Sequence, residues 1–476
     1  MLIAMAHFGT IGAVVSVINR EASTGGALDG SMNIDACAAL QLLPHLCHNE
    51  TKYLTVLALD ALKPIFSLVT LFKDVQSVVA LCLTTLSRTY GHFKSFTQGR
   101  QIGMFPSHVE IILDVMKLHQ NAADIQGSAC CVLNSYCDNA ILNALCSSID
   151  DELRTTLAAF GSVGAVNVVL DAMKRRPEHV LTQYHGCRFI SSFLRLMTSL
   201  NKKTFGITAV LSLGGLQQVL SLWQQHKSEG NIPNAVCLAL TEFCIDNGSQ
   251  ATIIAAGGVG IALSVLQTPD TSYPKLSQAM GLLTSMLADN DDKTKFQSKA
   301  VDAIVASGAI KTMVETMATS KTDRKGGKKA LVMQVCYVMI ALSRDPMPCE
   351  TFALHGGVQL LLDSIKSHKK TIGQWPNMTM ELLYRISRNK ALVLTLVAAG
   401  GIQTCMGFVD ISVDNNNSLN QMSLILHNIS QVPASKEFMK EPTLGLIPWV
   451  QTVLKDADYL DEEARQRYTN ILHVLV

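Results

Sequence analysis

The feature that most constrains this chain is a helical ending that recurs nine times. It consists of an apolar residue, two variable residues, a second apolar residue and then usually Cys or Ser. The second apolar residues are Leu46, Leu86, Tyr136, Phe193, Phe243, Met286, Leu342, Ile386 and Ile429. They are separated by 40, 50, 57, 50, 43, 56, 44 and 43 residues. Periods of this length are typical of units of two or three helices that stack on their neighbours.

A second pattern lies between these endings: a step of small residues followed by a branched residue and an amphipathic run. The clearest copies are Gly214-Gly215-Leu216, Gly257-Gly258-Val259, Gly308-Ala309-Ile310, Gly356-Gly357-Val358 and Gly400-Gly401-Ile402, with weaker copies at 12–14, 60–62, 103–105, 164–166 and 444–446. Because glycine is costly inside a helix, its recurrence at one phase predicts a sharp turn or a close approach between helices. Each module is expected to contain a short helix, a glycine turn, a second helix, a loop and a long helix.

These residues resemble a known family. The stretch NGSQATIIAAGGVGIALSVL, followed by KLSQAMGLLTSMLADN, is similar to the armadillo repeat of the β-catenin, importin-α and vacuolar-adaptor proteins. The resemblance covers nearly the whole chain and is strongest from Thr208 to Gln431. It implies an all-α fold, a right-handed superhelix of about ten repeats that forms one array over residues 1–476. HEAT repeats are the structural alternative, but they usually lack the glycine step.

The long third helix of each repeat is predicted from the recurring ending. The ten third helices are expected near 33–49, 75–90, 124–139, 182–197, 231–247, 274–290, 329–345, 375–389, 417–431 and 461–476. The first repeat lacks part of its first helix and the last ends on an apolar run, so both ends are expected to be incomplete repeats.

Composition narrows the possible partners. Lys and Arg number 39 against 38 Asp and Glu, so no global field directs the chain to nucleic acid. The densest basic cluster, residues 324–329, is expected to be a solvated loop. The 13 cysteines include no CxxC pair and fall mostly in apolar helical stretches. They are interpreted as core residues of a reduced compartment, and no metal or other cofactor is expected.

Two apolar segments could be mistaken for membrane or signal sequences. The N-terminal run contains Phe8-Gly9-Thr10-Ile11-Gly12-Ala13-Val14, which recurs as Phe160-Gly161-Ser162-Val163-Gly164-Ala165-Val166 deep inside the chain. It is therefore interpreted as part of a repeat rather than a cleaved signal. The uncharged run 391–409 is interrupted by Gly400-Gly401, which predicts two short core helices instead of a membrane span.

Residues beside the buried stripe of each third helix are predicted to line a concave groove. Importin-α-like proteins place Asn one residue before the closing apolar residue and Trp five before it, and this ladder holds extended basic peptides. In this chain only Asn428 matches, no Trp does, and Tyr337 occupies one of the minus-five places. The resemblance therefore does not extend to nuclear transport.

Arginine recurs instead two residues after the closing position. Arg88, Arg195, Arg344 and Arg388 hold four of the nine places, and Arg188 and Arg385 lie on the same stripes. Such a basic track favours an acidic or carboxylate-bearing peptide. The alternative is that arginine caps the helix end, where a cation suits the last carbonyls. Three carboxylates, Asp138, Glu242 and Glu381, interrupt the track.

No catalytic motif is present: the sequence contains no HExxH, no GxSxG and no kinase signature. The chain is predicted to be a non-enzymatic scaffold or adaptor whose groove holds extended or helical segments of other proteins. Its expected location is the cytoplasm, with the nucleus and the cytoskeleton as alternatives. The alternatives are a structural component of a cytoskeletal or ciliary assembly and a karyopherin-type transport adaptor, which the missing ladder argues against.

Overall fold

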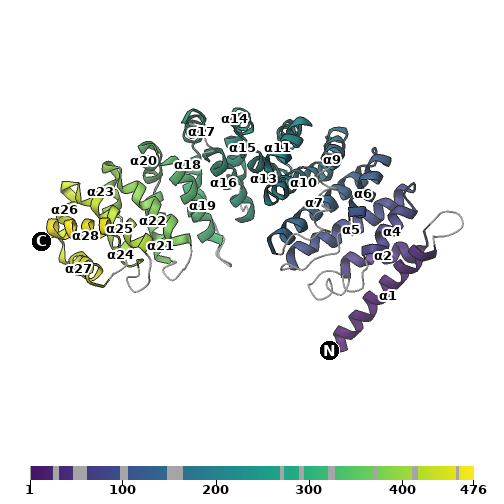
Figure 1. Cartoon of the computed structure of the whole chain (residues 1–476), viewed down its shortest axis with the longest axis horizontal. Coiled ribbons are helices and arrows are strands. Elements are labelled where there is room, and N and C mark those ends of the chain that lie inside the picture. The colour runs from purple at the N-terminus through teal and green to yellow at the C-terminus, as the bar shows by residue number, and fades with distance from the viewer. Residues whose placement is uncertain are drawn as a thin grey trace. The chain divides into compact units, whose positions relative to one another are not determined.

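The computed structural model describes residues 2–24, 32–46, 62–96, 106–146, 164–268, 273–288, 294–319, 327–367, 374–409, 416–456 and 460–476. Over these ranges the regular elements are all helices, and none is a strand (Figure 1). The chain forms two compact units, Met1–Asp246 and Asn247–Val476. Residues 324–326 of the predicted basic loop lie outside these ranges, whereas residues 327–329 form the start of a helix rather than a loop. Nothing is described of the side chains of 324–329.

The second unit consists of five successive helix triplets. They are α14 (Asn247–Ala255), α15 (Gly258–Leu266) and α16 (Tyr273–Leu287); α17 (Thr294–Ala306), α18 (Ala309–Thr319) and α19 (Gly327–Leu342); α20 (Pro346–Leu354), α21 (Gly357–Ser367) and α22 (Gln374–Ser387); α23 (Lys390–Ala398), α24 (Gly401–Met406) and α25 (Asn416–Ser430); and α26 (Pro433–Lys440), α27 (Leu446–Asp456) and α28 (Glu462–Leu475). A short 3-10 turn, Pro442–Leu444, joins α26 to α27. Each third helix packs on the next, so that α16, α19, α22, α25 and α28 form a continuous row.

The first unit follows the same plan. One complete triplet comprises α11 (Lys203–Ser212), α12 (Gly215–His226) and α13 (Ile232–Phe243). Four pairs precede it: α1 (Leu2–Thr24) with α2 (Ile34–Leu46), α4 (Leu62–Leu71) with α5 (Gln76–Phe96), α6 (Pro106–Leu118) with α7 (Ala123–Cys146), and α9 (Gly164–Arg175) with α10 (Val180–Ser199). The row of third helices runs α2, α5, α7, α10, α13. Triplets and rows of this kind make the chain the all-α, armadillo-type solenoid that the sequence predicts.

From α2 to α25, the helices of the two rows carry the closing apolar residues of the recurring ending. Their closing apolar residues are core residues: from Leu86 to Ile429, each of the eight with a described side chain is at most 1% exposed. Burial of this kind supplies the main stabilisation of a stack, because each repeat covers its apolar face with its neighbours. Whether all ten repeats form one array through both units stays a prediction.

The glycine step serves both purposes that the sequence suggested. The first glycine of each clear copy has a positive φ, between 74° and 85° at Gly214, Gly257, Gly308, Gly356 and Gly400. The second position packs against the preceding short helix, and at Gly401 an added Cβ would lie 2.7 Å from the Leu396 carbonyl oxygen. The turn therefore needs a left-handed residue followed by a small one, and Ala309 fills the second place in one copy.

The weakest copy of the step was predicted wrongly. Gly12 does not turn the chain, because α1 runs unbroken from Leu2 to Thr24 and the φ of Gly12 is not positive. A glycine in a helix interior costs about 1 kcal/mol relative to alanine, which does not stop the helix here. The apolar residues that follow form an ordinary buried stripe, which includes Ile11, Val15 and Ile18.

The uncharged run 391–409 forms two helices, as predicted. α23 ends at Ala398, Gly400 has a φ of 77°, and α24 begins at Gly401. Across the described residues no single helix is long and apolar enough to cross a membrane. Two bent pairs, α11 with α12 and α14 with α15, meet the criteria of length and composition alone.

Buried glutamines fasten third helices to second helices in the first unit. The Gln126 amide of α7 donates to the carbonyls of Met116 and His119, each at 2.9 Å. The Gln183 amide of α10 does the same to Met173 and Arg176, at 2.7 and 2.8 Å. Each amide therefore donates to two carbonyls at the C-terminal end of the preceding helix. Of these, the His119 and Arg176 carbonyls also accept a backbone N–H, from Ala122 and His179.

Replacing Gln183 by alanine is expected to lower the free energy of unfolding by about 1–3 kcal/mol, because the Met173 carbonyl loses its donor and the Arg176 carbonyl loses one of two. The matched control is Gln217→Ala on the exposed face of α12, which should leave stability within about 0.5 kcal/mol. Thermal melts of both variants, followed by circular dichroism, measure the difference. Equal melting temperatures would show that the brace contributes nothing.

Candidate functional site

The candidate site is the third-helix face, meaning the half-buried residues that lie beside the core stripe of the third helices. The structure puts the predicted residues Arg188, Tyr337, Arg385 and Asn428 in this partly exposed class, and Arg88, Arg195, Arg344 and Arg388 in the exposed class. The two units carry different chemistry on this face, and each is described separately below.

In the first unit, two arginines of α10 lie opposite two carboxylates of the neighbouring helices. An Arg188 terminal nitrogen lies 3.9 Å from Oδ2 of Asp138 on α7. The Arg195 Nε lies 3.9 Å from Oε1 of Glu242 on α13. Both separations exceed hydrogen-bond length, so each arginine is electrostatically paired without donating to its carboxylate. Within the described ranges neither guanidinium donates a hydrogen bond to any group, and the Arg188 Nε is buried.

A serine hydroxyl holds Asp138 in position. Ser192 Oγ lies 2.6 Å from Oδ1 of Asp138 and 2.8 Å from Oδ1 of Asn134. Because a hydroxyl has one proton, it donates to the charged carboxylate, and it can accept from Asn134 if the amide is turned. Asp138 is thereby fixed with one oxygen toward Ser192 and the other toward Arg188.

Glu242 is the most perturbed carboxylate of this face. Burial raises the pKa of the Glu242 carboxyl to about 7, against the opposing effect of the nearby cations Arg195 and Lys203. Its side chain is 14% exposed, whereas that of Arg195 is 45% exposed. A carboxylate at this depth is poorly solvated, so its negative charge is costly unless a cation stays close.

In the second unit, the corresponding side chains are hydrogen-bonded to one another. Arg385 donates to Glu381 one turn earlier on α22, and the other oxygen of Glu381 accepts from Gln421 of α25 at 3.1 Å. Asn428 of α25 donates to Ser387 at 2.9 Å. The one residue that fits the importin-like ladder thus links two third helices of this chain.

The four arginines of the plus-two series do not share one environment. Arg344 and Arg388 lie in the turns that follow α19 and α22, where a cation faces the last carbonyls of a helix. Arg88 and Arg195 lie inside α5 and α10, several residues before the helix ends. The helix-capping explanation therefore suits only the first two.

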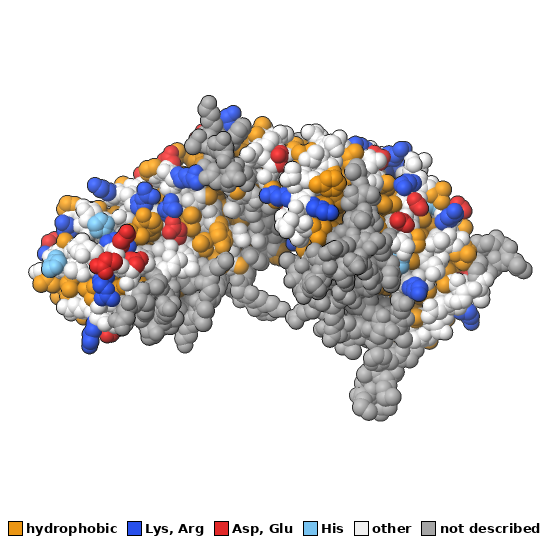
Figure 2. Space-filling view, viewed as in Figure 1, with side chains coloured by type: hydrophobic (Ala, Val, Ile, Leu, Met, Phe, Trp, Pro, Cys, Tyr) orange, Lys and Arg blue, Asp and Glu red, His pale blue; other side chains and the backbone are white. Residues whose placement is uncertain are grey.

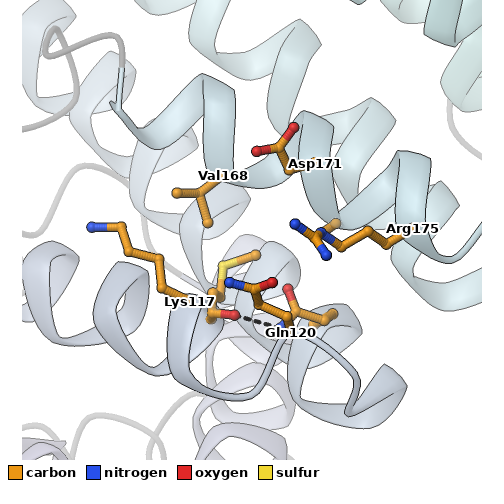
Figure 3. Close-up of a pocket in the computed structure, with 8 residues that line it drawn as sticks. Lys117, Gln120, Val168, Asp171 and Arg175 are labelled. Atoms are coloured by element: carbon orange, nitrogen blue, oxygen red, sulfur yellow. Dashed lines mark hydrogen bonds between the residues drawn. The ribbon is translucent and has the colours of Figure 1, made fainter.

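Small-molecule and metal chemistry find little support in the described part of the chain. A hollow between α6 and α9, lined by Lys117, Gln120, Asp171 and Arg175, has a volume of about 40 Å³ (Figure 3). Ligand pockets usually have roughly 300–1,000 Å³. Among the described residues no group of three or more His, Cys, Asp and Glu side chains could hold a metal ion. Nine of the eleven described cysteines are buried.

Sequence reasoning missed the role of the acidic residues. Asp138 and Glu242 were interpreted as interruptions of a basic track, whereas the structure shows them as the counter-ions of that track. The signal was available in the alternation of charge along consecutive third helices: Arg88, Asp138, Arg195 and Glu242 follow one another on α5, α7, α10 and α13. It also missed Tyr184 and His185, whose rings meet edge to face, 4.9 Å apart, on the same stripe of α10 as Arg188.

Comparison with known proteins gives a fold likeness and no family. No family model matches the chain, and no curated protein does. One similar solved structure is described as concerning a phosphorylation switch that controls the interaction between cadherin and beta-catenin. It superposes with a TM-score of 0.47 at 12% sequence identity, over 98% of this chain and 91% of that chain.

Proposed function

We propose that this chain is a protein-binding scaffold that holds partner segments on its third-helix face. The observation that carries the proposal is the pair of α10 arginines, whose guanidinium donors point to a half-exposed surface and make no hydrogen bond to any described residue. Polar groups on a structural surface are usually satisfied by protein or water, whereas a recognition surface keeps donors available for a partner. Stacked repeats also provide long surfaces without deep pockets, which suits extended segments.

The charge distribution supports local rather than global recognition. On the face drawn in Figure 2, Lys and Arg side chains are interspersed with Asp and Glu, and no single basic field covers the described surface. A partner would therefore be selected by particular arginines and their neighbours, not by net attraction.

The test is affinity capture from cell extract, with bound proteins read by mass spectrometry. The third-helix variant reverses three exposed arginines, Arg88→Glu, Arg195→Glu and Arg388→Glu. We expect the amount of specifically captured protein to fall by roughly tenfold or more, because each introduced glutamate repels the negative groups that the arginine attracts.

A matched control reverses three exposed lysines of second helices: Lys117→Glu in α6, Lys311→Glu in α18 and Lys366→Glu in α21. Their side chains are 58%, 57% and 46% exposed, and each lies near a carboxylate of its own helix. The control should keep its partners and both variants should keep helicity. Equal capture by all forms would refute the third-helix face as the binding surface.

A further inference from the structure

The stripe of α10 formed by Tyr184, His185, Arg188 and Arg195 carries two arginines that each lie near a carboxylate of a neighbouring third helix. Arg88 and Arg388 also donate to no described group, but neither forms an ion pair with a described carboxylate. Arg385 and Arg467 donate to a carboxylate or a hydroxyl, and Arg176 and Arg465 donate to backbone carbonyls. Arg188 and Arg195 donate to nothing described, although each is oriented by a carboxylate 3.9 Å away. The two guanidinium groups are thus held in place with their hydrogen-bonding capacity unused.

The spacing of these arginines indicates the form of the ligand. They are seven residues apart, which corresponds to about 10 Å along a helix. Two acidic residues three positions apart on a segment in the polyproline II conformation lie on the same side of it and are separated by roughly 9 Å. A single small anion between the arginines would have to draw both away from their carboxylates, on opposite sides of α10. A protein segment with spaced carboxylates can bind both arginines without moving either of them.

We propose that the α10 stripe is a binding site for an acidic protein segment, whose carboxylates accept the hydrogen bonds that Asp138 and Glu242 are too distant to accept. Bidentate arginine–carboxylate contacts are among the strongest polar contacts, which favours the exchange. The site rests on the proposed scaffold function and adds the chemistry of the partner and a form of regulation.

Binding to the α10 stripe is expected to depend on pH, because Glu242 is buried beside Arg195. An ionised Glu242 competes with the incoming carboxylate for Arg195, whereas a protonated Glu242 releases the arginine. The cations facing it are Arg195 of α10 and Lys203 of α11, and Asp246 follows α13. The titratable residue of α12, His226, is engaged with the Pro177 carbonyl at 2.6 Å. Because the pKa of Glu242 is about 7, binding should tighten as the pH falls from about 8 to about 6. A Glu-rich partner stays ionised over that range.

The probe is fluorescein-labelled decaglutamate, titrated with the full chain and followed by fluorescence anisotropy at low salt and at about pH 6 and pH 8. The double variant Arg188→Ala with Arg195→Ala should bind roughly tenfold more weakly or worse at both values. Glu242→Gln should bind at pH 8 as tightly as the unaltered chain does at pH 6, and should lose the pH dependence. Lys366→Ala, on a second helix of the second unit, is the matched control: its side chain is 46% exposed, against 45% for Arg195, and it should stay within about twofold.

Each other outcome overturns part of the inference. Undiminished binding by the arginine double variant, or an equal loss in Lys366→Ala, would remove the α10 site. A pH dependence that persists in Glu242→Gln, or that vanishes in His185→Gln, would remove the role of Glu242. If inorganic phosphate displaces decaglutamate at a concentration equal to that of the binding sites, the stripe is a small-anion site instead. If decaglutamate fails to bind while capture still depends on the third-helix face, the inference fails and the scaffold proposal stands.

Discussion

Gly401→Ala is expected to lower the free energy of unfolding of the second unit by about 2–3 kcal/mol. The added Cβ would lie 2.6 Å from the Leu396 Cδ1 atom and 2.7 Å from the Leu396 carbonyl oxygen. A side-chain methyl can move, but the carbonyl is fixed in the last turn of α23, so α24 has to shift away from α23. Forcing additional volume into a packed site typically costs 1–3 kcal/mol.

The matched control is Gly260→Ala in α15. Gly260 lies in a helix interior without a positive φ, and nothing lies within 4 Å of its added Cβ. Alanine there is expected to stabilise the unit by about 0.5–1 kcal/mol, because it restricts the unfolded chain and favours the helix. Thermal and urea unfolding of the two variants should give shifts of opposite sign. A neutral Gly401→Ala would mean that the second glycine of the step is not required for helix packing.

The glycine step shows which parts of the fold are accessible to sequence reasoning. Position and period were enough to predict both the turn and the close approach, because a left-handed turn favours glycine and a contact with a backbone carbonyl leaves room only for a small residue. The prediction failed at Gly12, because a glycine and a small residue inside a continuous helix satisfy the same sequence pattern.

The binding role of the candidate residues stays a prediction. Register alone places Arg188, Arg195 and Asn428 beside the core stripe, where they are half-buried or exposed. It did not show that Asn428 donates to Ser387 or that Arg385 is bonded to Glu381, since these distances depend on rotamers and on how far neighbouring helices are apart. Nor did it reveal that burial perturbs Glu242, because the depth of a side chain beside the core stripe is set by packing.

Acid should destabilise the first unit through His108, and this is the second large effect expected. His108 is 7% exposed and stacks on Phe66 with ring centroids 3.9 Å apart and planes 5° from parallel. Its Nδ1 lies 3.0 Å from the Tyr136 hydroxyl, which accepts a hydrogen bond from Tyr90 at 3.3 Å. Tyr136 therefore uses its own proton for Nδ1, so the imidazole is held neutral as an acceptor.

Burial lowers the pKa of His108 to about 4, and the nearby Lys63 charge adds to this effect. Above about pH 6.5 the imidazole is neutral in both the folded and the unfolded chain, and the folded state keeps its full stability. Between about pH 6.5 and pH 4 the unfolded chain binds the proton first. The free energy of unfolding should therefore fall by up to about 1.4 kcal/mol per pH unit, roughly 3 kcal/mol in total.

His108→Gln tests this directly, because glutamine can accept from Tyr136 and does not titrate. Melting temperatures of the variant and the unaltered chain, measured between about pH 4.5 and pH 7.5, should converge on acidification, since the unaltered chain loses stability that the variant does not.

Glu242 acts in the opposite direction. Because its pKa is raised, its contribution to the free energy of unfolding is full below about pH 4.5 and is lost as the pH rises through 7. Both chains contain Glu242, so the difference between them isolates the histidine. Parallel pH profiles would show that His108 is protonated in the folded state or exposed to solvent there.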